Sequence, residues 1–273
     1  LISFETDPST SSGQVTVQPG MFYRDFEKIA GEKGLFLPSY PASKSICAIG
    51  GMVANNAGGE KTLKYGKTEK YVEKIKIVLS DGNEYEIKKE QTEKGFLGEI
   101  YKKIEVLVKS NEKIIKQAKP NVSKNSAGYY IWNVWDGQNI DLNKMIVGSQ
   151  GTLGIITEVT FRLMPTTPDT RLVVIFLDKL EKIADVVNKI LKYKPESLEA
   201  YDDKTLKLAI RFFPGFLKGK TVWEAVKFAW SFWPDLFQRV LHGFPKLVML
   251  AEFPHDKLPK DFQDLHVRYR ISN

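Results

Sequence analysis

The stretch Ala48–Gly59, AIGGMVANNAGG, places four glycines and two asparagines in one short run. Its apolar residues follow no regular amphipathic pattern, and paired glycines weaken a helix or strand interior because they lose more backbone freedom on folding. We therefore expect a segment in which the backbone closely approaches another group or takes up unusual dihedral angles. A second glycine-rich stretch, VGSQGTLGIITEV, follows about a hundred residues later at Val147–Val159.

Both stretches carry groups suited to an anionic, flat ligand. Glycines expose backbone amides, and successive amides can form a concave nest for anionic oxygen atoms. Small side chains leave room for a bulky group at Ala48, Ala54 and Ala57. Neutral hydrogen-bonding groups are present at Ser43, Asn55, Asn56 and Thr152. The alternative, that each stretch is only a tight turn with close packing, stays open on the residues alone.

Other classes of site are disfavoured. The sequence contains no GxxxxGK[ST] phosphate loop, no GxGxxG after a strand and no GxSxG nucleophile elbow. The single cysteine, Cys47, excludes an internal disulfide. The three histidines, His242, His255 and His266, show no close ligand spacing, so we expect no metal site.

The charge pattern indicates a solvated surface. The formal net charge is +7, but glutamates are mixed among the lysines, as in KKEQTEKG. Such mixing is typical of a hydrated face, so we expect no nucleic-acid partner. An anion-binding module with a basic surface remains a third interpretation, although it does not explain two spaced glycine stretches.

Hydrophobic periodicity predicts the elements around the glycine stretches. The expected elements are a strand within residues 13–20, a helix over 22–30, a hairpin over 73–87 turning at Asp81-Gly82, a helix over 97–108 and a strand over 154–165. The breaker-rich run MPTTPD, residues 164–169, predicts a domain boundary.

A second domain is expected after that boundary. A strand over 171–177 and a helix over 180–191 predict an α+β arrangement. The aromatic-rich segment 223–241 predicts either a helix packed between domains or subunits, or an interfacial helix resting on a membrane. No apolar run approaches the ~20 residues of a transmembrane helix.

At Pro41–Gly66, PASKSICAIGGMVANNAGGEKTLKYG, and again at GYYIWNVW and DLNKMIVGSQGTLGIITEVTFRLMP, the sequence resembles the FAD-linked oxidases of the vanillyl-alcohol oxidase/PCMH superfamily. The branch it resembles most is the flavin-carrying glycolate oxidase and D-lactate dehydrogenase type. The resemblance covers about Val15 to Pro165, and the second domain more loosely. It implies an α+β fold: the second part of a PCMH-type FAD-binding domain in residues 1–165, incomplete at the N-terminus, followed by the start of an α+β cap domain in residues 166–273.

The resemblance also implies a site and a reaction. FAD would be the cofactor, and a small 2-hydroxy acid such as D-lactate or glycolate would lose a hydride to it. The electrons would pass to a quinone, an iron–sulphur protein or oxygen. The implied location is cytoplasmic, with a peripheral contact at the inner face of the membrane, or with another subunit, left open for 223–241. By position, the FAD-contacting residues would be Ala42, Ser43, Ala48, Ile49, Gly51, Asn55, Ala57, Gly58, Gln150, Gly151, Thr152, Gly154, Ile155 and Ile156.

The sequence departs from the family pattern in three places. Gln150 stands where the family usually has glutamate, the glycine-rich phosphate loop upstream of VTVQPG is absent, and so is the HxHGDGN-like segment. The chain therefore looks like the middle of a longer enzyme, and no residue is assigned as the catalytic base. A non-catalytic flavin-binding or structural subunit of a redox complex is the alternative.

Five further side chains are candidates for special roles. Some members of the superfamily attach FAD covalently, and Cys47 falls where they often carry a small Ser, Thr or Cys, so a small residue packed beside the cofactor is the favoured interpretation. Arginine pairs bidentately with carboxylates, so an arginine can anchor a carboxylate substrate. The candidates are Arg211, Arg239, Arg268 and Arg270, for each of which an ordinary surface charge is the favoured interpretation.

Overall fold

The chain folds into two compact units, Leu1–Thr167 and Pro168–Asn273. The structure is a computed structural model that describes residues 3–7, 12–88, 94–122, 125–166, 169–217, 221, 223, 245–258 and 267–272. The division between the units falls two residues after the domain boundary expected at 165/166.

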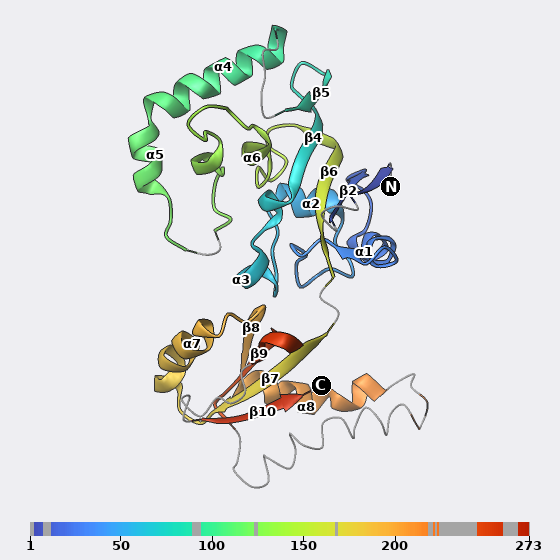
Figure 1. Ribbon diagram of the computed structural model, residues 1–273, viewed down its shortest axis with the longest axis vertical. Coiled ribbons are helices and arrows are strands. Elements are labelled where there is room, and N and C mark those ends of the chain that lie inside the picture. Colours follow the sequence, from blue (N-terminus) through green and yellow to red (C-terminus); the bar gives the residue numbers. More distant parts are fainter. Residues whose placement is uncertain are drawn as a thin grey trace. The chain divides into compact units, whose positions relative to one another are not determined.

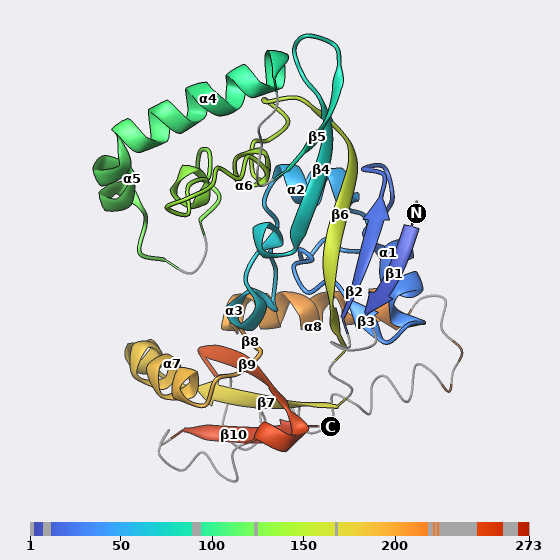
Figure 2. The same cartoon turned by 45° about the horizontal axis from the view of Figure 1, so that its top comes forward.

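The first unit is built on a six-stranded sheet (Figures 1 and 2). Its strands are β1 (Ser3–Asp7), β2 (Ser12–Val17), β3 (Leu35–Phe36), β4 (Val72–Val78), β5 (Glu84–Ile87) and β6 (Ile155–Pro165). Their order is β1-β2-β6-β4-β5, with β3 also on β6 and all pairs antiparallel.

The other elements of this unit are helices and short helical turns. They are α1 (Tyr23–Gly31), α2 (Ile49–Ala54), α3 (Thr62–Tyr65), η1 (Thr68–Lys70), α4 (Gly95–Ser110), α5 (Glu112–Ala118), η2 (Ile131–Asn133) and α6 (Asn143–Ile146). Both views place α4 and α5 on the side of β4 and β5, and α1 on the side of β1 and β2 (Figures 1 and 2).

The core of this unit lies on one face of the sheet. Val159, Phe161 and Leu163 alternate along β6 and are fully buried. The burial of each such side chain stabilises the fold by about 1.5–3 kcal/mol. Helices α1, α2 and α4 contribute buried residues to the same cluster. The glycine stretches are therefore joined to elements that pack into this core.

The opposite face of the sheet is polar. The hydroxyls of Thr16 and Thr160 are 2.9 Å apart across β2 and β6. On β4 and β6, Lys76 pairs with Glu158 at 3.0 Å between Nζ and Oε1. Cross-strand pairs of this kind reinforce the register.

The expected elements of the first unit are confirmed, except within Ala48–Gly59. The strand, the helix, the hairpin, the second helix and the long strand are β2, α1, β4–β5, α4 and β6. The first glycine stretch begins as helix α2, Ile49–Ala54, which the sequence pattern did not predict, and then has an unusual dihedral angle of the expected kind at Asn56, where φ is 47°. Ile49, Met52 and Val53 recur at helical spacing and are buried, and the glycine pair between them obscured that pattern.

The second unit combines an antiparallel sheet with helices, in agreement with the expected α+β arrangement. Its elements are β7 (Thr170–Leu177), η3 (Leu180–Lys182), α7 (Ile183–Lys192), β8 (Ser197–Asp202), α8 (Asp203–Leu217), β9 (Leu247–Pro254), η4 (His255–Lys257) and β10 (Arg268–Ser272). The strand order is β10-β7-β9-β8. The expected helix 180–191 is confirmed, with its first turn in the tighter 3₁₀ form. Val186 and Ile190 of α7 pack on β7 and β9.

Several expectations fall on residues outside the described ranges. These include 224–241 of the aromatic segment, Arg239, His242 and His266. Across the described residues, no helix has the length and apolarity needed to cross a bilayer. The same residues contain no group of three His, Cys, Asp or Glu side chains placed to hold a metal ion.

Candidate cofactor-binding site

The two glycine stretches lie side by side at the C-terminal end of α2. The Gly148 amide donates to the carbonyl of Val53 at 2.9 Å, and the Gln150 amide donates to that of Ala54 at 2.8 Å. The Gln150 side-chain amide also donates to Asn55 Oδ1 at 3.1 Å. We call the contact between Asn55 and Gln150 the junction. Residues about a hundred positions apart in sequence therefore form one continuous surface.

Unusual backbone conformations hold the junction. Asn56 and Gln150 adopt left-handed conformations, with φ of 47° and 56°. This region is uncommon for residues other than glycine, and asparagine tolerates it best. The buried Asn56 side chain accepts a hydrogen bond from the Glu69 amide at 3.0 Å, which fixes the turn from behind. Such locally strained turns cluster at ligand sites.

The first two backbone amides of α2 already donate hydrogen bonds within the protein. Those of Ile49 and Gly50 donate to the carbonyls of Met21 and Pro19, at 2.9 and 2.8 Å. The idea that the glycine amides of this stretch form a phosphate nest therefore does not apply to these two. Gly51 differs, because it is exposed and a Cβ built on it meets no atom within 4 Å. Its backbone is open to a ligand.

A shallow groove of about 730 Å³ lies beside the start of α2. It is lined by Gln18, Pro19, Gly20, Met21, Phe22, Asp25, Ile156 and Thr157. Of the fourteen residues expected to contact FAD, this groove contains Ile156. The other expected residues lie in or next to α2, at the junction, in the loop before α2 or, for Gly154 and Ile155, at the start of β6.

A bulge in β6 lies directly after Ile155 and Ile156, and these two isoleucines, as consecutive strand residues, point to opposite faces of the sheet. Lys76 pairs with Glu158 but Ile77 pairs with Ile156, so Thr157 is an extra residue in the ladder. Bulges re-aim neighbouring side chains and are frequent next to active sites. Ile156 lines the groove, whereas Ile155 is 71% exposed. One face of a flat ring cannot rest on both side chains.

Most of the expected contact residues are accessible. The exposed ones are Ala42, Ser43, Gly51, Asn55, Gln150, Gly151, Thr152 and Ile155. Ala48, Gly58, Gly154 and Ile156 are half-buried. Ile49 and Ala57 are buried and pack into the core, so they support the surface from beneath.

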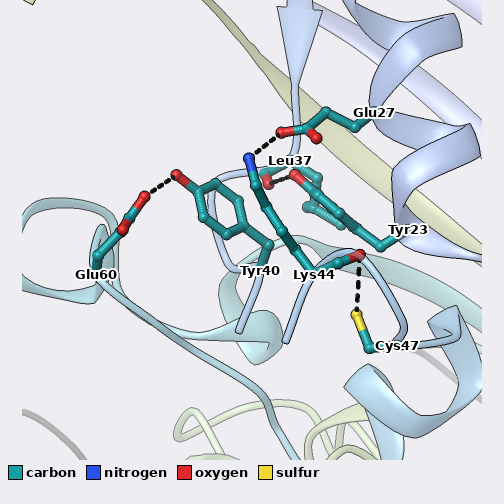
Figure 3. A network of polar contacts seen from close by, with 7 residues as sticks. All are labelled: Tyr23, Glu27, Leu37, Tyr40, Lys44, Cys47 and Glu60. Atoms are coloured by element: carbon teal, nitrogen blue, oxygen red, sulfur yellow. Dashed lines mark hydrogen bonds and ion pairs between the residues drawn. The ribbon is translucent and has the colours of Figure 1, made fainter. Parts of the chain in front are cut away.

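The loop that carries Ala42 and Ser43 is braced by polar contacts (Figure 3). The Tyr23 hydroxyl donates to the Leu37 carbonyl at 2.8 Å. The Tyr40 hydroxyl donates to Glu60 Oε1 at 2.7 Å, which ties the loop to the residue after the second glycine pair.

A third contact ties the same loop to α1. Lys44 Nζ lies 2.8 Å from Glu27 Oε1 and 4.7 Å from the centre of the Tyr40 ring. Figure 3 shows Lys44 beside Tyr40, with Glu27 beyond its amine. An exposed ion pair of this kind contributes little to stability, about 0–1 kcal/mol, so its role is to orient the loop.

Two buried tyrosines make the fold sensitive to alkali. Burial, followed by the Glu27 carboxylate, raises the pKa of Tyr23 far above its ordinary value, and burial raises the pKa of Tyr71 to about 12. Each phenol is thus held neutral by the fold, so its contribution is complete below about pH 10 and is lost as pH rises toward 12. We expect the urea midpoint to fall between pH 10 and 11. The double variant Tyr23→Phe, Tyr71→Phe should show a shallower decline, and equal declines would contradict this assignment.

The Cys47 thiol is half-buried and unreactive in character. Its sulfur lies 3.8 Å from the Lys44 carbonyl, and burial raises the pKa of the thiol. A thiol that stays protonated is a poor nucleophile. This agrees with the favoured interpretation of a small packed residue.

Two buried polar atoms were not foreseen from the sequence. Among the described residues, Thr62 Oγ1 and Glu69 Oε2 have no hydrogen-bond partner. Both residues lie next to the NNAGG turn. The Glu69 amide bonds to the Asn56 side chain, and a Cβ added to Gly58 would come within 2.5 Å of the Thr62 hydroxyl. Orphaned polar atoms in a native fold call for a partner. The open backbone at Gly51 is accessible and fits a site completed by a ligand such as FAD, whereas the two orphaned atoms are buried.

Three of the arginines considered as substrate anchors are described, and all three belong to the second unit. Arg268 pairs with Asp178 within the second unit, and Arg211 is an exposed residue of α8. Arg270 lies on β10 opposite Val174. Their role in substrate binding stays a prediction.

Comparison with known proteins identifies the chain's relatives. Residues 4–88 match the FAD binding domain family. The chain is 31% identical over 193 residues to the glycolate oxidase subunit GlcD of Bacillus subtilis (strain 168), and 29% identical over 187 residues to a D-lactate dehydrogenase of Anaerostipes hadrus. These alignments cover 70% and 68% of the chain, but 32% and 30% of the relatives. The chain thus spans about a third of the length of the curated proteins it matches.

The fold agrees with this result. An alkyldihydroxyacetonephosphate synthase structure superposes with a TM-score of 0.57, covering 91% of this chain and 35% of that protein, at 17% sequence identity. At that identity the likeness concerns the fold alone. The matched domain shows that the chain carries an FAD binding domain and that its cofactor is FAD, and over most of its length the chain is similar to these glycolate oxidase and D-lactate dehydrogenase relatives.

Proposed function

We propose that this chain forms part of an FAD-dependent oxidoreductase that oxidises a small 2-hydroxy acid. The observation that carries the proposal is the direct hydrogen bonding of the two glycine stretches at Asn55 and Gln150. If each glycine stretch were only a packing turn, nothing would require the two stretches to meet on an exposed surface. Their contact there supports a shared ligand. The first unit would serve as FAD-binding domain and the second as cap.

Different residues of the site would make different kinds of contact with the cofactor. The open backbone at Gly51 and Gly151 would allow close approach of a ligand, since a Cβ on either meets nothing within 4 Å. Asn55 and Gln150 would offer neutral hydrogen bonds at the junction. Ile156, with Met21 and Phe22 in the groove, would supply apolar contact for a flat ring. When bound, FAD supplies the hydride acceptor that the protein itself lacks.

The substrate class comes from the names of the relatives. They include a glycolate oxidase, a D-lactate dehydrogenase and a D-2-hydroxyglutarate dehydrogenase of Xanthomonas citri pv. viticola, 28% identical over 193 residues. All three named substrates are small 2-hydroxy acids, so we propose this class without choosing among its members. A quinone, an iron–sulphur protein or oxygen would take the electrons from the reduced cofactor.

The test is the visible spectrum of the purified chain, titrated with FAD. We expect yellow protein with flavin bands, and pigment released on denaturation that is identified as FAD. The loaded protein is then mixed with glycolate, D-lactate or D-2-hydroxyglutarate, and bleaching of the flavin bands is followed. Folded protein that is colourless once the excess of unbound FAD has been removed would contradict the proposed cofactor role.

The second candidate is a non-catalytic flavin-binding subunit. Gln150 favours it, since its neutral amide bonds to Asn55 where the family pattern places a charged glutamate. The same experiment separates the two candidates. Flavin bands that bleach with a hydroxy acid support the enzyme, whereas bound FAD that none of the three acids reduces supports the binding subunit.

A further inference from the structure

Tyr129 is an exposed aromatic residue held at the edge of the site. It is 42% exposed, yet its hydroxyl lies 2.8 Å from Thr152 Oγ1. Thr152 donates its own proton to the Ser149 carbonyl at 2.6 Å, so the tyrosine is the donor in the shared bond. The Tyr129 carbonyl also accepts the Ile131 amide at 3.0 Å. The hydroxyl of the ring and the backbone of Tyr129 are thus both held by hydrogen bonds, while the ring remains accessible.

The position of Thr152 places this ring beside the junction. Thr152 closes the turn that begins at Ser149, and its amide donates to the Ser149 carbonyl at 3.1 Å. The same turn contains Gln150, which bonds to Asn55, and Gly151, whose backbone is open. A ligand lying on the junction would therefore meet the ring of Tyr129 at its edge.

The neighbouring aromatic residues are already engaged. Tyr130 contacts Trp132 with ring centres 5.8 Å apart, and Lys67 lies over the Tyr130 ring. Trp135 has Lys109 over its ring at 4.3 Å. Within the described part of the chain, no aromatic or cationic group packs on the ring of Tyr129. A fixed aromatic face without an occupant is suited to a planar partner.

We propose that Tyr129 is a cofactor-contact residue whose ring packs against one of the two planar ring systems of bound FAD. This inference rests on the proposed function, because it requires FAD at the junction. Stacking of an aromatic side chain on a nucleic-acid base changes affinity by about 5- to 150-fold, which sets the expected scale. The Thr152 hydroxyl positions the ring by accepting its O–H.

The test compares binding of FAD, FMN and ADP to the full chain by isothermal titration. Tyr129→Leu removes the ring and should weaken FAD binding by about 10-fold or more, within the range for ring stacking. Tyr129→Phe keeps the ring and should retain most of the affinity. The matched control is Phe96→Leu, which removes an exposed ring at the start of α4 and should change nothing.

The three ligands identify which ring system is contacted. A loss confined to FAD and FMN assigns the contact to the flavin ring, and a loss confined to FAD and ADP assigns it to adenine. Equal FAD affinity of wild type and Tyr129→Leu overturns the inference while the proposed function stands. Absence of FAD binding by the wild type overturns both. If Tyr129→Leu is not folded by circular dichroism, Tyr129→Met serves in its place, with the same expected loss.

Discussion

Gly59→Ala is expected to lower the free energy of unfolding of the first unit by about 3 kcal/mol, near the upper end of the range for overpacking. A Cβ on Gly59 would stand 2.5 Å from the Tyr40 carbonyl oxygen and 3.2 Å from the Ala42 amide nitrogen. Both neighbours are backbone atoms, which cannot rotate away as a side chain can. The chain must separate the second glycine pair from the loop that carries Ala42 and Ser43. Urea unfolding followed by circular dichroism measures the loss.

Gly51→Ala is the matched control within the same stretch. Gly51 lies in α2, and an added Cβ meets nothing within 4 Å. Alanine in a helix is favoured over glycine by about 0.8–1 kcal/mol, so this variant should be at least as stable as wild type. If FAD lies over α2, Gly51→Ala should nevertheless bind it more weakly. A stable Gly59→Ala variant would show that the loop does not press on Gly59.

The elements around the site could be predicted from the sequence, because their signals are local. The alternation of Val15 and Val17, and the Asp81-Gly82 turn between two apolar runs, depend only on neighbouring residues. Helix α2 was missed for an equally local reason: its buried face consists of Ile49, Met52 and Val53, and the glycines between them obscured this helical spacing.

The arrangement of the site required the structure. The sequence offered both glycine stretches and the side chains that would bind a flavin, but the pairing of Gln150 with Asn55 is a contact between distant segments. The bulge at Thr157 is invisible in the sequence, since the strand has a regular pattern on either side of it. The orphaned Thr62 and Glu69 atoms are also products of packing. Patterns among neighbouring residues carry no information on such contacts.

Gly154→Ala combines two costs and is expected to destabilise the first unit by about 3–4 kcal/mol. Gly154 has φ of 156°, which side-chain-bearing residues rarely adopt. A Cβ there would also stand 2.7 Å from the Val78 carbonyl oxygen and 2.8 Å from the Ile77 side chain. The start of β6 would have to move away from β4. Ile156 would leave the groove, so FAD binding should weaken together with urea stability.

Gly82→Ala separates the two costs. Gly82 has φ of 80°, but an added Cβ meets nothing within 4 Å, so this variant carries backbone strain without a clash. We expect a loss of about 1–2 kcal/mol, the strain of a left-handed residue alone, and unchanged affinity for FAD. The difference between the variants then measures how tightly β6 presses on β4 beside the site. If Gly154→Ala and Gly82→Ala lose the same stability and bind FAD equally well, Gly154 acts through its dihedral angle alone and does not position Ile156.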